Sequence, residues 1–197
     1  MSQFWNEKFD TPDYIYGKQP NAWFKECVDK LKAGKILVPG SGEGRDAVYA
    51  AINGWQVTAF DSSSVAKQKA EQLAQENGVS IDYSVCDVRD FEAAPETFDA
   101  VGITFFHLPP DLRKQFHKKV VESLKPGAAI FMEMFTPEQL NNQSGGPKSV
   151  ELLYDVDMLT DDFMELTSFQ VTLEEITLDE GPLHQGKANV VRLYGIK

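Results

Sequence analysis

The stretch KILVPGSGEGRDAVYAAI, residues 35–52, decides the fold of this 197-residue chain. Its apolar start, residues 35–38, stops at a Pro-Gly pair, and a helical pattern follows at residues 45–52. A buried strand, a tight glycine-rich turn and a helix are therefore predicted in direct succession. In such a unit the N–H groups of the turn face the crevice at the carboxyl end of the strand, where a nucleotide can rest.

The alternation of strands and helices continues beyond this unit. Further elements are predicted as strands at 55–60, 81–86, 98–105 and 128–135, and as helices from the serines at 62–64 to residue 77 and at 111–124. Parallel strands joined by right-handed helical crossovers are the usual outcome of this pattern. We therefore expect an open α/β sheet with helices on both faces.

Two predicted strands, residues 170–178 and 189–196, close the chain without a helix between them. Adjacent strands without a crossover must pair as an antiparallel hairpin. A seven-stranded sheet is predicted in consequence, with five parallel strands and a C-terminal antiparallel hairpin, in a single domain of residues 1–197. A long polar segment, residues 136–148, follows the fifth strand, and we interpret it as a lid over the site, the alternative being a disordered spacer.

Composition narrows the classes of function. Thirty Asp and Glu against nineteen Lys and Arg give a net charge of −11, which would repel a phosphate backbone, so no nucleic-acid partner is expected. Ten of these acids, and no basic residue, lie in residues 151–180, interpreted as a solvated face. No apolar run approaches the roughly 18 residues of a membrane span, and the N-terminus lacks a secretory signal, so we expect no membrane partner and a cytoplasmic location.

The cysteines and histidines do not predict a metal site. Cys27 and Cys86 lie in apolar patterns and are interpreted as small buried hydrophobes. The three histidines show none of the short paired spacings that bind zinc, so no metal is expected. His117 lies in a basic run, residues 113–125, that we interpret as the exposed face of an amphipathic helix.

Carboxylates end the second and third predicted strands. Asp61 lies 21 positions after Gly40 (61 − 40), near the roughly 20-residue offset at which a carboxylate meets ribose hydroxyls. A helix N-cap is the compatible alternative for Asp61. Asp87 ends the third strand, where it can accept from an exocyclic amine while Val88 offers a backbone N–H. The three strand ends together predict a nucleoside site.

The glycine spacing separates two classes of nucleoside cofactor. Nicotinamide enzymes use G-x-G-x-x-G or G-x-G-x-x-A, in which the third small residue lets helix and strand pack closely. This sequence has G-x-G-x-G at residues 40–44, and Arg45 stands where that third small residue would be. An NAD(P)-dependent Rossmann oxidoreductase is therefore the alternative interpretation rather than the first.

These motifs, in this order, resemble the class I S-adenosylmethionine-dependent methyltransferases, which have a Rossmann-like sheet. The resemblance covers roughly residues 35–196. Three further segments are similar to the small tellurite-resistance-type and thiopurine-type methyltransferases: residues 5–9 through 14–21, residues 145–148 through 152–154, and residues 180–186.

The resemblance implies S-adenosylmethionine as cofactor, with the glycine loop on its methionine part, Asp61 on the ribose and Asp87 on the adenine. Residues 1–30 would form a cap over the sulfonium, and residues 136–157 a lid-like insertion. Pro39 departs from the family pattern of Asp or Glu, which leaves Arg45 as a possible partner for the methionine carboxylate. The implied cofactor-binding set is Trp5, Tyr16, Gly40, Gly42, Gly44, Arg45, Asp61, Ser62, Asp87, Val88 and Phe105.

Methyl transfer from a sulfonium mainly requires alignment of the reacting atoms and exclusion of water, with a base only for protonated acceptors. His107 is the catalytic candidate because it follows the fourth strand, and His184 has similar status. The run Leu108-Pro109-Pro110-Asp111 lacks the polar and aromatic residues that DNA amino-methyltransferases carry around Pro-Pro, which favours a small-molecule substrate. The resemblance and the lack of a base favour a soft acceptor atom: sulfur, selenium or tellurium. A non-catalytic S-adenosylmethionine-binding domain is the second alternative, and no oligomeric state is predicted.

Overall fold

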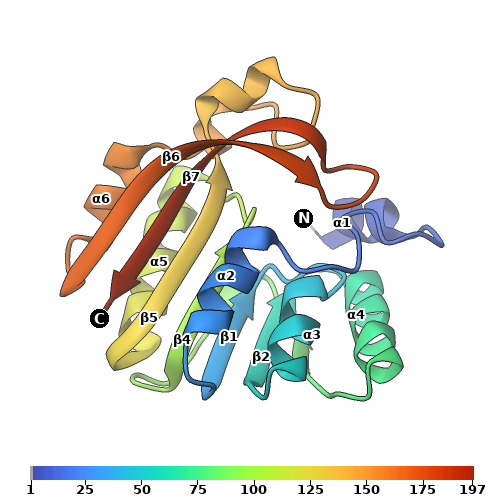
Figure 1. Ribbon diagram of the computed structural model, residues 1–197, viewed down its shortest axis with the longest axis horizontal. Coiled ribbons are helices and arrows are strands. Elements are labelled where there is room, and N and C mark those ends of the chain that lie inside the picture. Colours follow the sequence, from blue (N-terminus) through green and yellow to red (C-terminus); the bar gives the residue numbers. More distant parts are fainter. Residues whose placement is uncertain (1) are drawn as a thin grey trace.

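Seven strands form one mixed sheet in the computed structural model, which describes residues 2–197 (Figure 1). The strands are β1 Lys35–Pro39, β2 Gln56–Asp61, β3 Asp82–Val85, β4 Phe98–Thr104, β5 Leu124–Phe135, β6 Ser168–Asp179 and β7 Gln185–Ile196. Their order is β3-β2-β1-β4-β5-β7-β6. Strands β1 to β5 pair in parallel, and β7 is antiparallel to both β5 and β6. The predicted fold class, five parallel strands extended by an antiparallel hairpin, is confirmed.

Helices cover both faces of this sheet, as predicted. The covering helices are α2 Ala22–Lys30, α3 Arg45–Ile52, α4 Ser64–Glu76, α5 Pro110–Ser123 and α6 Val156–Phe163, whereas α1 Ser2–Phe9 packs on α4. Side chains of β1 alternate between the two cores, because Leu37 packs with Phe116 of α5 while Ile36 packs with Phe24 of α2 and Ala47 of α3. Within the described residues, no helix is long and apolar enough to cross a membrane. The cytoplasmic location stays a prediction.

Some element boundaries differ from the sequence-based prediction. Strand β5 begins at Leu124 rather than residue 128, because Leu124 pairs with Phe98 beyond an irregularity in the β4–β5 register. The terminal hairpin is longer than predicted and pairs continuously from Ser168 with Ile196 to Asp179 with Gln185. Much of β6 is exposed at the sheet edge, so its sequence shows little of the alternation that marks a half-buried strand.

The long segment after β5 is ordered and packed on the hairpin. It contains two short 3-10 helices, η2 Pro137–Asn141 and η3 Val150–Leu152. The Gln139 side chain donates to Ser144 Oγ (2.9 Å) and accepts from the Asn189 N–H of β7 (2.9 Å). The alternative of a disordered spacer is therefore wrong, whereas movement of this segment as a lid stays a prediction.

The prediction of a fully exposed basic face on α5 is wrong at two positions. Arg113 and His117 are buried, and both donate to the Asp162 carboxylate of α6, from Nε and Nδ1 respectively, at 2.8 Å. Helix α6 packs against α5 from a part of the chain about 45 residues away. The helical period of α5 alone could not reveal this second buried face.

Candidate active site

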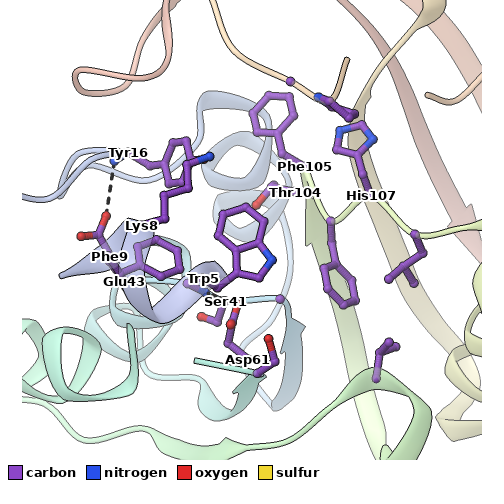
Figure 2. Close-up of a pocket in the computed structure, with 18 of the residues that line it drawn as sticks. Trp5, Lys8, Phe9, Tyr16, Ser41, Glu43, Asp61, Thr104, Phe105 and His107 are labelled. Atoms are coloured by element: carbon purple, nitrogen blue, oxygen red, sulfur yellow. Dashed lines mark hydrogen bonds between the residues drawn. The ribbon is translucent and has the colours of Figure 1, made fainter. Parts of the chain in front are cut away.

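A cavity of about 600 Å³ lies at the carboxyl ends of the five parallel strands (Figure 2). Each strand contributes at or just after its end: Gly40, Asp61, Asp87, Thr104 and Phe135. The N-terminal segment and residues 146–149 complete the walls. This volume is in the range of small-molecule and cofactor sites. Every residue predicted for the site lines this cavity except Gly44.

The glycine loop between β1 and α3 requires glycine for two different reasons. At Gly40, φ is +58°, and a Cβ would lie 2.2 Å from the ring of Phe106. At Gly44, φ is +88°, and a Cβ would lie 2.5 Å from the Cβ of Ala70 in α4. Gly44 therefore serves helix packing rather than direct contact with the cavity. Ser41 lies between them, and its buried Oγ has no hydrogen-bond partner among the described residues, as expected where a polar ligand group completes the site.

Asp61 lines the cavity in a fixed orientation. Its Oδ2 accepts from the Gly42 N–H (3.2 Å) and its Oδ1 from the Ser63 N–H (3.0 Å). Burial raises the pKa of this carboxyl, while the backbone N–H donors oppose the rise. The N-cap of α4 is Ser63, whose Oγ accepts from the Ala66 N–H, so Asp61 is not needed as the cap. Its remaining lone pairs can accept from a vicinal diol, as the nucleoside prediction requires.

Asp87 is an ionised acceptor at the end of β3. The Arg89 side chain donates to it through Nε (2.8 Å) and a terminal nitrogen (2.7 Å), and these bonds lower the pKa of Asp87 to about 2. Val88 follows as the first residue of η1, Val88–Asp90, and is itself buried. Both residues line the cavity, beside Ser62 and Cys86.

Arg45 has a structural role that the sequence did not indicate. Its guanidinium donates to the Tyr16 carbonyl (2.9 Å) and pairs with the Glu180 carboxylate (2.9 Å), with both charged side chains about one-tenth exposed. The residue thereby ties the N-terminal segment to the terminal hairpin. Its role toward a methionine carboxylate stays a prediction, and its charge is already matched by Glu180.

The N-terminal segment is held over the cavity by Glu43 and Lys69, neither of which the sequence predicted. Glu43 accepts from the Tyr16 N–H (3.3 Å, dashed in Figure 2) and from Lys69 Nζ (2.5 Å). Lys69 also donates to the carbonyls of Phe9 (3.1 Å) and Asp13 (2.6 Å). No sequence pattern links these residues. The only available signal was a charged residue placed between two glycines of the loop.

Aromatic residues form the wall opposite the glycine loop. Phe105 has φ of +50°, a strained conformation for a bulky residue, and its ring stacks on Phe135 at 4.3 Å between centroids. His107 also stacks on Phe135, at 5.6 Å, and His184 meets the same ring edge-on at 5.5 Å. Trp5 of α1 faces this wall from the N-terminal segment (Figure 2). This part of the cavity is suited to an apolar or polarisable ligand.

Both cavity histidines have one ring nitrogen fixed by an acceptor. His107 Nδ1 donates to the Leu152 carbonyl at 2.7 Å, so its Nε2 carries a lone pair, and that atom is buried without a partner among the described residues. Burial lowers the pKa of His107 to about 4. His184 Nδ1 donates to Glu180 at 3.3 Å, and burial lowers the pKa of His184 as well. Both rings are neutral near pH 7.

The residues that line the cavity fit a nucleoside sulfonium cofactor. A glycine cradle with an unpaired Ser41 hydroxyl, a diol acceptor at Asp61 and an ionised acceptor at Asp87 lie on successive strand ends. The antiparallel β7 also distinguishes the sheet from the 3-2-1-4-5-6 order of dehydrogenases, so the nicotinamide alternative is not supported. Fold and site together have the features of the S-adenosylmethionine-dependent methyltransferases.

Comparison with known families agrees with this class. Residues 36–127, which run from β1 into β5, match the family model described as a methyltransferase domain. This matched segment, a little under half of the chain, agrees with the class that the sequence resemblance implied.

Two curated relatives share part of their length with this chain. One is the tRNA (uracil(54)-C(5))-methyltransferase of Pyrococcus abyssi, 28% identical over 67% of this chain and 35% of that protein. The other is thiocyanate methyltransferase 1 of Arabidopsis thaliana, 27% identical over 79% of this chain and 65% of that protein. The chain spans about a third of the first relative and just under two thirds of the second.

Solved structures share the fold at low sequence identity. An S-adenosylmethionine-dependent methyltransferase from Methanosarcina mazei superposes with a TM-score of 0.67 at 20% identity, over 91% of this chain and 98% of that one. TehB from Haemophilus influenzae superposes with a TM-score of 0.69 at 16% identity, over 100% of this chain and 66% of that one. These likenesses establish the architecture.

Proposed function

We propose that this protein transfers a methyl group from S-adenosylmethionine to a small-molecule acceptor, and that the accepting atom is a soft nucleophile such as sulfur, selenium or tellurium. The observation that carries the proposal is the make-up of one cavity. Polar groups suited to the cofactor lie along the strand ends, and an aromatic wall without an effective base lies opposite.

Bound S-adenosylmethionine would supply a methyl group that is already activated by its attachment to a positively charged sulfur. Ser41, Asp61 and Asp87 at the strand ends would hold the cofactor, which would offer this methyl group to an acceptor in the aromatic part of the cavity. The chain's own task is to align the two reactants and to exclude water. Trp5 and Phe105 are placed to do this, because they face one another across the cavity from the N-terminal segment and the end of β4 (Figure 2).

We retain His107 as the candidate catalytic residue. Its free Nε2 can accept a hydrogen bond from an acceptor that arrives protonated. However, a group with a pKa of about 4 is a weak base near pH 7, where a general base works best with a pKa close to the ambient pH. Acceptors that are intrinsically strong nucleophiles, or already ionised, are therefore favoured over alcohols and amines.

The relatives support different acceptors. The Arabidopsis thaliana relative is named for thiocyanate, a soft anion, which agrees with the proposal. The Pyrococcus abyssi relative is named for a tRNA base, but this chain covers only 35% of it. The net charge of −11 opposes contact with a phosphate backbone, so we propose a small-molecule partner and no nucleic acid.

The first test is calorimetric titration with S-adenosylmethionine and S-adenosylhomocysteine. We expect Asp61→Asn to weaken binding of both about ten-fold through loss of charge-assisted hydrogen bonds. Asp90→Asn, at an exposed position outside the cavity, should leave binding unchanged. Failure of the wild-type protein to bind either compound would remove the proposal.

The second test is transfer of a radiolabelled methyl group to thiols, selenite, tellurite, catechols and amines, and then to a cell extract with identification of the product. Labelling of a thiol or chalcogen species is the expected result. Labelling of only hydroxyl or amine acceptors would contradict the soft-nucleophile proposal. Binding of the cofactor without transfer to any acceptor or extract would favour a non-catalytic binding domain.

A further inference from the structure

Three of the charged side chains that line the cavity have an ion-pair partner inside the protein. Glu43 is paired with Lys69, Asp87 with Arg89, and Arg45 with Glu180. Lys8 and Lys148 also line the cavity, yet neither has a carboxylate within 4.0 Å in the described part of the chain. Asp46 and Asp61 line the cavity without an ion pair too, but protein N–H and O–H groups donate to both carboxylates. The ammonium groups of Lys8 and Lys148 have neither an ion pair nor a hydrogen bond among the described residues, so they can meet a bound anion.

Lys8 is the better placed of the two lysines. It lies on α1, one turn after Trp5, and its ammonium is 4.7 Å from the Trp5 ring centroid and 5.4 Å from that of Tyr16. Lys8 is half-buried, and burial lowers the pKa of its ammonium. In Figure 2 the Lys8 side chain runs beside the Tyr16 ring within the cavity.

Lys8 lies one aromatic ring away from His184, because both contact Tyr16. Burial is the main cause of the lowered pKa of His184, and the positive charge of Lys8 adds to it. His184 packs on Tyr16 at 4.5 Å and on Phe105 at 4.8 Å between ring centroids. The Tyr16 ring thus lies between the Lys8 ammonium and the histidine side of the aromatic wall, where we place the methyl acceptor. The two neutral histidines there do not compete with Lys8 for an anion.

We infer that Lys8 determines specificity by recognising negative charge on the methyl acceptor, so that the preferred acceptors are small, soft anions. This inference rests on the proposed methyl transfer. An anionic acceptor also suits the reaction. Methyl transfer from a cationic sulfonium to an anion removes one positive and one negative charge. A site with apolar, water-excluding walls favours that loss of charge.

Lys8 could instead bind the carboxylate of the cofactor, which is also an anion. Two measurements separate these two roles, and both use the full-length chain with Lys8→Met, Lys8→Arg and a control, Lys114→Met. Lys114 is an exposed lysine on α5, outside the cavity and likewise without an ion pair among the described residues.

The first measurement needs no cofactor. Iodide, a soft anion that quenches indole fluorescence on contact, is titrated into the protein, with neutral acrylamide in parallel. Trp5→Phe isolates the Trp5 signal from those of Trp23 and Trp55. We expect Lys8→Met to lower the iodide quenching of Trp5 about two-fold or more without the same change for acrylamide. Lys8→Arg and Lys114→Met should behave like the wild type.

The second measurement compares cofactor and acceptor. The dissociation constant of S-adenosylhomocysteine is measured by calorimetry, and KM and kcat are measured with thiocyanate and with a neutral thiol, 2-mercaptoethanol. We expect Lys8→Met to raise KM for thiocyanate about ten-fold and to leave the other binding constants within about two-fold. Lys8→Arg should restore most of the thiocyanate affinity.

Three outcomes would overturn the inference: unchanged iodide quenching in Lys8→Met, equal effects on thiocyanate and the neutral thiol, or weakened S-adenosylhomocysteine binding with unchanged thiocyanate KM. The last outcome would assign Lys8 to the cofactor carboxylate. If the wild-type protein bound iodide through Lys8 but did not bind S-adenosylhomocysteine, the methyltransferase proposal would fail while the anion site remained.

Discussion

At the scale of single residues, Gly44 requires glycine both for its backbone conformation and for close packing. Its φ of +88° disfavours any side chain, and a Cβ there would lie 2.5 Å from the Cβ of Ala70. We predict that Gly44→Ala lowers the free energy of unfolding by about 2–4 kcal/mol, from backbone strain plus overpacking between α3 and α4.

Gly78 is the matched control for this substitution. Its φ is +69°, but a Cβ there meets nothing within 4 Å. Gly78→Ala should therefore cost about 1 kcal/mol, from backbone strain alone. Urea unfolding of both variants measures the difference, and equal costs would mean that contact between α3 and α4 does not require the glycine.

The protonation state of His107 gives a second prediction at this scale. Because burial lowers its pKa to about 4, the imidazole stays neutral from about pH 5 upward. We expect kcat/KM for an anionic acceptor to show no inflection from His107 between pH 5 and 9. His107→Ala should slow transfer to protonated thiols about ten-fold or more, because the hydrogen-bond acceptor is lost, and should affect anionic acceptors much less. Equal slowing of both would indicate a purely structural role for His107.

At the scale of secondary-structure elements, the N-terminal segment depends on one lysine of α4. Lys69 reaches two backbone carbonyls of the segment and the buried carboxylate of Glu43. We predict that Lys69→Met loosens residues 9–16 and speeds their amide hydrogen exchange about ten-fold or more, since three anchoring contacts are lost together. Binding of S-adenosylhomocysteine should weaken in parallel.

Lys67 on the same helix provides the control. Among the described residues it pairs only with Glu71, at 3.5 Å on the surface. Lys67→Met should leave hydrogen exchange of residues 9–16 and cofactor binding unchanged. A uniform rise in exchange across the whole chain in Lys69→Met would point to global destabilisation instead of a loosened cap.

The elements of the sheet were predictable because their local patterns agree with their tertiary environment. Helix α3 has the predicted bounds, and Ser63, one of three candidate serines, caps α4. The prediction failed where burial comes from a distant partner. His117 was predicted to lie at the surface, but it is buried and contacts Asp162 of α6. The sequence of α5 gives no sign of that contact.

At the scale of the whole molecule, Glu180 connects segments that are far apart in sequence. Its carboxylate pairs with Arg45 (2.9 Å) and accepts from Asn21 Nδ2 (3.0 Å) and His184 Nδ1 (3.3 Å). The turn of the hairpin, α3 and the N-terminal segment therefore meet at one buried acid. We predict that Glu180→Gln lowers the free energy of unfolding by about 3–5 kcal/mol, because it leaves the buried Arg45 charge unpaired.

The pH dependence of this effect has a definite sign. Burial opposes ionisation of Glu180, but the hydrogen bond from His184 and the charge of Arg45 hold its pKa below the usual range. An acid with a lowered pKa stabilises the fold above its unfolded pKa of about 4.3, and this contribution is lost as the pH falls through the folded value. The difference between wild type and Glu180→Gln should shrink below about pH 4.

Urea unfolding over a range of pH tests this prediction. Glu175→Gln is the control within the same hairpin, because Glu175 forms an exposed pair with Lys187 at 2.7 Å. This substitution should leave the free energy of unfolding nearly unchanged. A similar small effect at Glu180 would mean that the buried pair does not hold the hairpin to the rest of the fold.

The acidic side chains of residues 151–180 form two groups, one exposed and one buried. Most of these acids are exposed, as the sequence predicted, and contribute to the net charge of −11. Asp162 and Glu180 are instead buried acceptors that join α6 to α5 and the hairpin to α3. Composition alone could not separate these two acids from the other eight.

The sequence by itself determined the fold class. It also predicted a site at the carboxyl edge of the sheet, with the glycine loop, Asp61 and Asp87 as its residues, and the structure places these residues at one cavity. These features follow from local periodicity and from the fixed geometry of strand ends, so neighbouring residues are enough to predict them. Only the tertiary structure decided that Glu43 and Lys69 hold the N-terminal segment and that Arg45 pairs with Glu180. It also decided that Lys8 lies over the Trp5 ring in the cavity, without a carboxylate partner among the described residues. Such pairings depend on contacts between residues far apart in the chain, whose energies are set by burial that the sequence does not display.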